Sequence, residues 1–301
     1  MQIFTFRVLR DIVETGSFSR AAALNHITQS AVSQQIRHLE DQLSTQLFDR
    51  SGRRVELTPA GQVAYQAALE ILAAHDRMRE GIERILNVVR GTIRLATVYS
   101  VGLHELPPYT RQFLSAYPQV NVLVEFSRAE AVYDLVAEGR VDLGIVAYPE
   151  ETAQVRSLPF RSDRLVVVCH PDHAWARLRQ IALPEIKGVD FVAFNQDSPT
   201  RRTLDRELGR VGARVNCVLE LDNVETIKQA VEINTGISIL PLPAVLAEVE
   251  RGTLCRIEVT DPVLMRPLGL LIRRNRLLPP ALRAFLGVLT PVEVEEPEPD
   301  A

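Results

Sequence analysis

The chain of 301 residues has few cysteines, almost no lysine and no long apolar run. None of its hydrophobic segments approaches the ~20 consecutive apolar residues of a membrane-spanning helix. Its N-terminus lacks the basic stretch, apolar run and cleavage site of a secretory signal. The sequence therefore predicts a cytoplasmic protein with no membrane partner.

Signatures of catalysis and of redox or metal chemistry are also missing. The three cysteines, Cys169, Cys217 and Cys255, form no CxxC pair, and we expect them to be small buried residues. The motifs GxSxG, HExxH, GxGxxG and GxxxxGK do not occur, which argues against an enzyme. The segment HPDH, from His170 to His173, suggests a metal site, but two loop histidines at this spacing are more often surface residues. We expect no metal and no cofactor.

Residues 17 to 40, SFSRAAALNHITQSAVSQQIRHLE, predict two short helices joined by a turn at residues 25 to 27. The alanines between Ser19 and Leu24 allow a second helix to cross closely. Thr28 is the expected N-cap of that second helix, and Ser30 is a competing choice. Apolar residues then recur at steps of four, three and four and predict one buried stripe: Val32, Ile36, Leu39 and Leu43.

The opposite face of the second helix has no apolar residues to bury. It carries groups that hydrogen bond to base edges and phosphates: Gln29, Ser30, Ser33, Gln34 and Arg37. A preceding amphipathic helix spans the apolar residues from Phe4 to Val13, and Phe18 is expected to fill the space between it and the alanine-rich helix. From spacing alone, an ordinary helical hairpin remains an alternative interpretation.

The segment LFDRSGRRVELTPAG, at residues 47 to 61, predicts two strands around a glycine turn, followed by a helix that starts at Pro59. Such a hairpin beside the two helices forms a winged helix-turn-helix. Guanidinium groups on its loop suit phosphate oxygens: Arg50, Arg53 and Arg54. Residues 1–60 hold seven arginines and six acidic residues, so DNA binding must depend on placement and on dimerisation as well as on charge.

The string SFSRAAALNHITQSAVSQQIRHLEDQLSTQLFDR followed by LTPAG resembles the LysR-type transcriptional regulators, and the resemblance covers the whole chain. It implies a DNA-binding domain at residues 1–58. The residues it assigns to base or backbone reading are Gln29, Ser30, Ser33, Gln34 and Arg37. Those it assigns to phosphate contacts are Thr28, Arg50, Arg53 and Arg54. The family often has a proline where Ser30 stands.

Residues 59–90 form one long helical pattern with a heptad seam, which favours pairing with a second helix. The seam consists of Ala64, Ala68, Ile71, His75, Met78, Ile82, Ile85 and Val89. A homodimer formed here presents two recognition helices, so the expected target is double-stranded DNA with an interrupted inverted repeat, its half-sites ~34 Å or a multiple apart. The resemblance implies a homotetramer in use, and RNA polymerase is a further candidate partner.

From residue 91 to residue 290, strand and helix patterns alternate, which predicts a parallel sheet flanked by helices. We expect two lobes, lobe I at 91–161 and 267–290 and lobe II at 162–266, joined by two crossings of the chain. The resemblance implies an effector-binding domain similar to periplasmic solute-binding proteins. The expected fold class is therefore α/β, with an N-terminal winged helix-turn-helix, a linker helix, a two-lobed domain and an acidic disordered tail at 291–301.

Ligands of open α/β sheets bind beyond the carboxyl ends of strands, next to helix N-termini. The hydroxyl residues expected there are Ser100, Ser127, Ser198, Thr200 and Thr226. Nearby guanidinium groups can take a carboxylate or phosphate, or can simply be solvated: Arg128, Arg201 and Arg202. We expect a small anionic or polar metabolite of unknown identity as effector. The alternative functions are a transport-type solute-binding protein or an enzyme built on the two-lobed domain.

Overall fold

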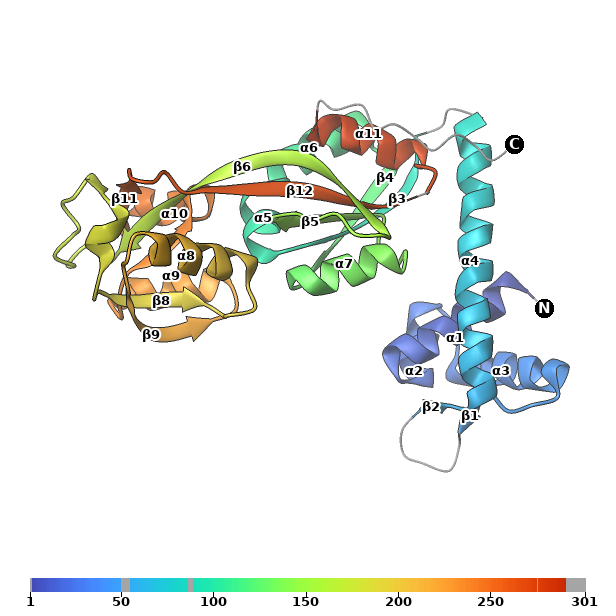
Figure 1. Cartoon of the computed structure of the whole chain (residues 1–301). Coiled ribbons are helices and arrows are strands. Elements are labelled where there is room, and N and C mark those ends of the chain that lie inside the picture. Colours follow the sequence, from blue (N-terminus) through green and yellow to red (C-terminus); the bar gives the residue numbers. More distant parts are fainter. Residues whose placement is uncertain (1, 50–54, 86–88, 275, 291–301) are drawn as a thin grey trace. The chain divides into compact units, whose positions relative to one another are not determined.

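The computed structural model describes residues 2–49, 55–85, 89–274 and 276–290, and the chain divides into two units, residues 1–86 and 87–301 (Figure 1). Among these described residues, no helix is long and apolar enough to cross a membrane. The arginines expected on the wing, Arg50, Arg53 and Arg54, and the tail 291–301 lie outside the described residues.

The first unit begins with three helices, α1 (Ile3–Thr15), α2 (Phe18–Leu24) and α3 (Gln29–Leu43). Gly16, in the left-handed conformation, ends α1, and the Ser17 hydroxyl accepts the Arg20 N–H to cap α2. Thr28 caps α3 by accepting the Ala31 N–H at 3.2 Å, so the predicted cap is confirmed.

These helices share one apolar core, to which α1 contributes Val8, Leu9 and Ile12 and α3 contributes Val32, Ile36 and Leu39. Leu43 is 41% exposed, so its place in the buried stripe was wrong. The reason is that Ser44 takes the left-handed conformation and ends α3, after which Leu47 and Phe48 fill the core instead. Phe18 contacts the Phe48 ring edge-on at 5.3 Å between ring centres.

The wing is a short antiparallel pair, β1 (Phe48–Asp49) and β2 (Glu56–Leu57), and helix α4 (Pro59–Ile85) follows it. The Thr58 hydroxyl accepts the Gly61 N–H at 2.9 Å and so helps to start the helix where Pro59 predicted it. The helix is shorter than the predicted linker, because Val89 and Arg90 are not helical.

Two residues of the predicted heptad seam are used within the first unit. Ala68 is fully buried in the core of that unit with Leu72, and Ala64 packs against the same core. The part of the seam that is free to pair with a second helix therefore starts later than predicted. It contains the exposed residues Ile71, Met78 and Ile82.

Lobe I of the second unit is built on a five-stranded sheet in the order β4-β3-β5-β12-β6. Its elements are β3 (Gly91–Thr97), α5 (Tyr99–His104), α6 (Leu106–Ala116), β4 (Val120–Phe126), α7 (Ala129–Ala137), β5 (Leu143–Ala147), the first part of β6 (Val155–Cys169), β12 (Met265–Arg273) and α11 (Pro280–Leu289). Strand β3 pairs in parallel with β4 and β5, whereas β12 is antiparallel to β5 and β6. The prediction of a parallel sheet holds for β3, β4 and β5 and is wrong for β12, which returns from lobe II and runs antiparallel to both of its neighbours.

Lobe II surrounds the second part of β6. Its elements are β7 (Gln180–Ile181), the 3-10 helix η1 (Leu183–Ile186), β8 (Asp190–Phe194), α8 (Pro199–Arg210), β9 (Asn216–Leu221), α9 (Val224–Glu232), β10 (Ser238–Pro241), α10 (Leu242–Arg251) and β11 (Cys255–Val259). Strands β8 and β9 pair in parallel, while β10 and β11 pair antiparallel with β6. Apolar residues of the strands and helices form two cores, one on each side of the sheet.

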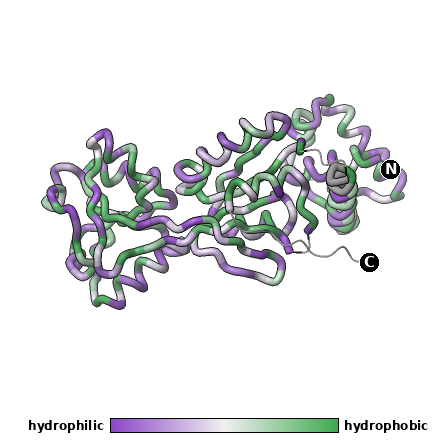
Figure 2. Tube along the Cα trace, turned by 90° about the horizontal axis from the view of Figure 1, so that it is seen from above, coloured by the Kyte–Doolittle hydropathy of each residue, from purple (hydrophilic) through white to green (hydrophobic). Residues whose placement is uncertain are grey.

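The two lobes are connected where β6 and β12 run side by side, with Met265 opposite Arg164 at one end and Arg273 opposite Val155 at the other. Figure 2 shows this narrow connection from above. Helix α5 begins at Tyr99, just after β3. The N–H groups of residues 101 and 102 donate hydrogen bonds to the Val98 carbonyl, and these bonds close its first turn.

Candidate functional site

The polar face of α3 lies on the surface of the first unit. Thr28, Gln29, Ser30, Gln34 and Arg37 are exposed, and Ser33 is half-buried. Two hydrogen bonds of these side chains stay on the same helix: Gln29 Nε2 donates to Ser33 Oγ at 2.9 Å, and Arg37 Nε donates to the Ser33 carbonyl at 3.3 Å. All six side chains are thus placed to meet a ligand outside the unit.

Buried polar contacts fix the orientation of this helix. Glu40 accepts the backbone N–H groups of Leu47 and Phe48, at 2.9 and 3.4 Å, and so ties α3 to the first strand of the wing. On the side of α1, the Thr5 hydroxyl donates to Gln35 Oε1 at 2.9 Å. The sequence analysis missed Glu40, although a carboxylate within an apolar stripe is the signal that could have revealed it.

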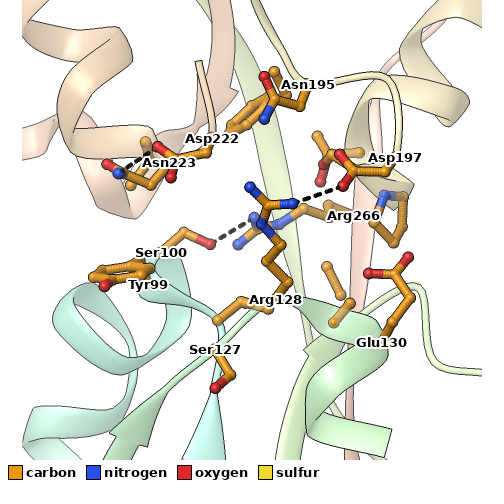
Figure 3. A pocket seen from close by; sticks show the side chains of 18 residues that line it. Tyr99, Ser100, Ser127, Arg128, Glu130, Asn195, Asp197, Asp222, Asn223 and Arg266 are labelled. Carbon is orange, nitrogen blue, oxygen red and sulfur yellow. Dashed lines mark hydrogen bonds and ion pairs between the residues drawn. The ribbon is translucent and has the colours of Figure 1, made fainter. Parts of the chain in front are cut away.

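A second site is a cleft between the two lobes (Figure 3). Its volume is roughly 750 Å³, which includes space open to solvent. Four helices begin at its wall, with Tyr99 of α5, Ala129 of α7, Pro199 of α8 and Val224 of α9 among the lining residues. Helix N-termini present unpaired N–H groups and favour negative charge. The predicted residues that line the cleft are Ser100, Ser127, Arg128, Ser198 and Thr200.

The structure does not place the remaining predicted residues in the cleft wall. Arg201 donates to Asp205 at 2.8 Å, to the Phe194 carbonyl at 2.8 Å and to Glu220 at 3.1 Å, so its guanidinium is occupied within lobe II. Arg202 donates to the Asp197 carbonyl.

Thr226 is used in the first turn of α9. Its hydroxyl donates to the Asn223 carbonyl at 3.0 Å, while its N–H donates to Asn223 Oδ1 at 3.0 Å. The residue that lines the cleft at this turn is Asn223.

The most deeply buried charge of the cleft is Arg266 on β12, which the sequence analysis missed. It is 2% exposed, and it donates to Ser100 Oγ at 3.0 Å (Figure 3). On its other side it donates to Asp163 Oδ2 at 2.6 Å. An arginine inside a strand that crosses between lobes is the signal that points to it. The other polar residues that were missed are Tyr99, Glu130, Asn195, Asp197, Asp222 and Asn223.

Charges in the cleft are mixed. Arg128 and Arg266 line it together with the carboxylates Glu130, Asp197 and Asp222, and Arg128 is paired with Asp197 at 3.2 Å. Hydroxyl and amide groups supply further donors and acceptors. This arrangement suits a small ligand that combines an acidic group with several hydrogen-bonding groups.

The histidines of HPDH serve a local turn. His170 Nδ1 accepts the Asp172 N–H at 3.0 Å, and His173 Nδ1 accepts the Trp175 N–H at 3.1 Å. Among the described residues, no group of three or more His, Cys, Asp or Glu side chains is placed to hold a metal ion.

Two cysteines lie opposite each other although they are far apart in the sequence. Cys169 of β6 pairs with Cys255 of β11 in the sheet, and burial beside Cys255 raises the pKa of the Cys169 thiol to about 12. Cys217 is exposed, so the prediction of burial was wrong for this residue, whose side chain projects from β9 at the outer edge of the β8-β9 pair.

Comparisons with known proteins assign each of the two units to a protein family. Residues 4–62 match the family of bacterial regulatory helix-turn-helix proteins of the lysR type, and residues 87–292 match the LysR substrate binding domain. A probable RuBisCO transcriptional regulator of Cyanidioschyzon merolae is 31% identical over 90% of this chain and 91% of its own length. The uncharacterized HTH-type transcriptional regulator YeiE of Escherichia coli is also 31% identical, over 95% of this chain and 96% of its own.

Solved structures share the fold at lower identity. A full-length OxyR variant from Pseudomonas aeruginosa is 24% identical, with a TM-score of 0.72 over 96% of this chain and 93% of that one. Full-length CbnR, solved with its target DNA, is 17% identical, with a TM-score of 0.70 over 96% and 99%. The effector binding domain of QuiR, solved with shikimate, is 21% identical, with a TM-score of 0.61 over 66% and 95%.

Proposed function

Since the chain belongs to the LysR-type transcriptional regulator family, we propose that it binds an interrupted inverted repeat in double-stranded DNA as a homodimer or homotetramer and responds to a small anionic or polar metabolite. The family consists of DNA-binding regulators and not of enzymes. The relatives of equal identity carry different names, so they support the family and leave the regulated genes open. In this proposal the protein acts in the cytoplasm, with RNA polymerase as a further candidate partner.

The exposed polar face of α3 is the observation that carries the DNA-reading proposal. Gln34 and Arg37 stand on this face, while the apolar side of the same helix is covered by the core. An uncovered face of amide, hydroxyl and guanidinium groups fits the major groove, where base edges offer both donors and acceptors. Full-length CbnR, a protein of the same fold, was solved with its target DNA.

The apolar stripe on α4 supports dimerisation. Ile71, Met78 and Ile82 are exposed there at steps of seven and four, and exposed side chains at such spacing bury well against a second helix. Two chains joined along this stripe bring two copies of α3 to successive turns of one DNA duplex.

The interlobe cleft supports the effector proposal. Arg266, buried beside Ser100, offers a charge-assisted contact to a carboxylate or phosphate, and four helix N-termini favour the same sign of charge. The QuiR domain of the same fold was solved with shikimate, itself a carboxylate. A ligand changes DNA binding to the extent that it binds one state of the assembly better than another.

A DNA-shift assay on the fragment upstream of the protein's own coding region tests the DNA function. The regulator is expected to retard this fragment in preference to a scrambled one at the same salt. A transport-type binding protein would retard neither fragment, and this result would overturn the proposal.

Substitution Ser100→Ala tests the effector site. We expect the variant to keep its DNA affinity and to lose most of its response to the metabolites that shift the wild-type complex. Exposed Ser115, on α6 and outside the cleft wall, gives the control Ser115→Ala, which should respond like wild type. A full response in Ser100→Ala would show that the effector binds elsewhere.

A further inference from the structure

Two buried carboxyl groups lie next to the interlobe cleft without lining it. Glu105 follows α5 in lobe I, and Asp163 lies on β6 where the chain crosses between lobes. Glu105 is 3% exposed and Asp163 is 2% exposed. Burial of two acidic groups side by side is costly unless each has a partner of opposite charge or a proton.

Arginines satisfy only one oxygen of each carboxyl group. Arg161 lies 2.7 Å from Glu105 Oε2, and Arg266 donates to Asp163 Oδ2 at 2.6 Å. Glu105 Oε1 and Asp163 Oδ1 are buried without a hydrogen-bond partner, since the 3.9 Å between Arg161 Nε and Asp163 Oδ1 is too long for one.

A proton satisfies both of these oxygens at once. Two carboxylates only accept hydrogen bonds, whereas a carboxylic acid donates one to a neighbouring carboxylate. Burial and the adjacent Asp163 raise the pKa of Glu105 to about 7, while Arg161 and Arg266 act in the opposite direction. With this pKa, the pair holds the proton below about pH 7 and loses it above.

The same arginine connects the pair to the cleft. Arg266 lines the cleft, donates to Ser100 Oγ on one side and to Asp163 on the other, and has a buried Nε without a protein partner. An anion bound at this guanidinium adds negative charge close to the carboxyl pair. Added negative charge favours the protonated form of a neighbouring acid.

We propose that Glu105 and Asp163 share one proton and that binding of an anionic effector at Arg266 and Ser100 is coupled to uptake of this proton by the carboxyl pair, so that the affinity for the effector rises as the pH falls. The inference rests on the proposed function, because the effector cleft is the same. In this proposal the proton is a second ligand, besides the effector, whose binding influences the regulator.

A second titratable group lies close by and needs a control. His104 precedes Glu105 but faces lobe II, where its Nε2 lies 2.7 Å from Glu225 of α9, and Glu225 also pairs with Lys228 at 3.0 Å. Imidazoles titrate in the same pH range as the proposed pair. The variant His104→Gln removes this contribution and leaves the carboxyl pair in place.

The first experiment measures thermal unfolding of the full chain from pH 5 to pH 8.5 without ligand. A folded-state pKa raised from 4.5 to about 7 means that the folded protein holds more protons than the unfolded one in this window. The contribution of this pair to the free energy of unfolding is therefore complete below pH 4.5 and is lost as the pH rises through 7. In Glu105→Gln, whose amide can donate to Asp163, this decline should disappear, whereas it should persist in His104→Gln and in Glu138→Gln. An unchanged decline in Glu105→Gln would overturn the shared proton.

The second experiment uses sulfate as the anion, because it remains a dianion throughout this pH range. Calorimetric titrations in two buffers of different ionisation enthalpy, at ionic strength fixed with chloride, report the protons taken up on binding. Wild type should take up as much as one proton per sulfate near pH 7.5, and its affinity should fall by as much as ~10-fold per pH unit above that. Glu105→Gln should bind sulfate with no proton uptake, and Glu138→Gln, exposed and outside the cleft wall, should match wild type.

The outcomes separate the two proposals. If sulfate binds in the cleft without proton uptake, or if Glu105→Gln retains the uptake, the coupling is wrong and the effector site stands. If Ser100→Ala and Arg266→Lys bind sulfate as wild type does, the cleft is not the anion site and the proposed effector site fails. If wild type binds no sulfate, the coupling through Arg266 is overturned, while the unfolding data still decide whether the proton is shared.

Discussion

Arg128 of lobe I and Asp197 of lobe II form an ion pair of 3.2 Å between the lobes, on the wall of the interlobe cleft. The side chains are 64% and 51% exposed, so solvent limits the pair to about 1 kcal/mol or less. Replacement of Asp197 by an anionic effector at the Arg128 guanidinium therefore costs little free energy. So weak a pair adds little to the connection between the lobes and does not prevent a ligand from binding there.

Removing the carboxylate at position 197 tests this relationship. We expect Asp197→Asn to bind sulfate about two- to fivefold more tightly and to change the free energy of unfolding by less than about 1 kcal/mol. Calorimetry at constant ionic strength measures the affinity, and Glu138→Gln, outside the cleft wall, is the control. Weaker sulfate binding in Asp197→Asn would indicate that the carboxylate positions the cleft and does not compete with the ligand.

Base reading by α3 predicts a difference between two kinds of variant. Gln34→Ala should relax the preference at one base position by ~1 to 3 kcal/mol, because a side-chain amide distinguishes base edges. Arg53→Ala, on the wing segment outside the described residues, should weaken binding to all sequences alike, as a phosphate contact does. Footprints at matched salt compare the two. An unchanged base preference in Gln34→Ala would remove this residue from sequence readout.

The buried carboxylate of Glu40 should matter more for stability than its position on a DNA-binding helix suggests. Glu40→Ala leaves the N–H groups of Leu47 and Phe48 without this acceptor, at a cost of ~1 to 3 kcal/mol for each buried group left unsatisfied. Chemical denaturation measures the loss, and Asp41→Ala, exposed on the same helix, should be nearly neutral. Equal stability of the two variants would contradict the role of Glu40 as an anchor of the wing.

Local features of the fold could be predicted from the sequence because their causes are local. The Thr28 cap depends on a hydroxyl three residues before an N–H group, and the start of α4 depends on Pro59. The hydroxyls that line the cleft, such as Ser100 and Ser127, follow from the rule that ligands bind beyond the ends of strands.

Contacts between distant parts of the chain could not be predicted in the same way. Arg266 is 103 residues from Asp163 and 166 residues from Ser100, so its burial and its partners appear only once β6 and β12 are paired. For the same reason, the sequence could not show that the Arg201 guanidinium donates a hydrogen bond to Glu220. Leu43 was predicted to be buried because periodicity does not reveal where a helix ends.

The exposed apolar stripe of α4 predicts how a charge affects assembly. Met78→Glu should weaken self-association by ten-fold or more, because a carboxylate in the seam loses its hydration when two helices pair. Arg77→Glu changes the charge of an exposed neighbour outside the stripe and is the control. Sedimentation velocity over a range of protein concentrations distinguishes the variants. If Met78→Glu assembles as wild type does, the two chains pair through another surface.

The cysteines should differ in reactivity although all three are free thiols. Cys169 is fully buried and burial raises the pKa of its thiol to about 12, so almost none of it is thiolate at neutral pH. The exposed Cys217 should react first with a disulfide reagent, even though burial of part of its thiol raises its pKa as well. Titration with such a reagent should show one fast thiol in wild type, lost in Cys217→Ser, and reaction of Cys169 only after unfolding. Fast loss of two thiols in the Cys217→Ser variant would instead indicate that β6 and β11 separate readily and that the facing pair Cys169 and Cys255 is accessible to oxidants.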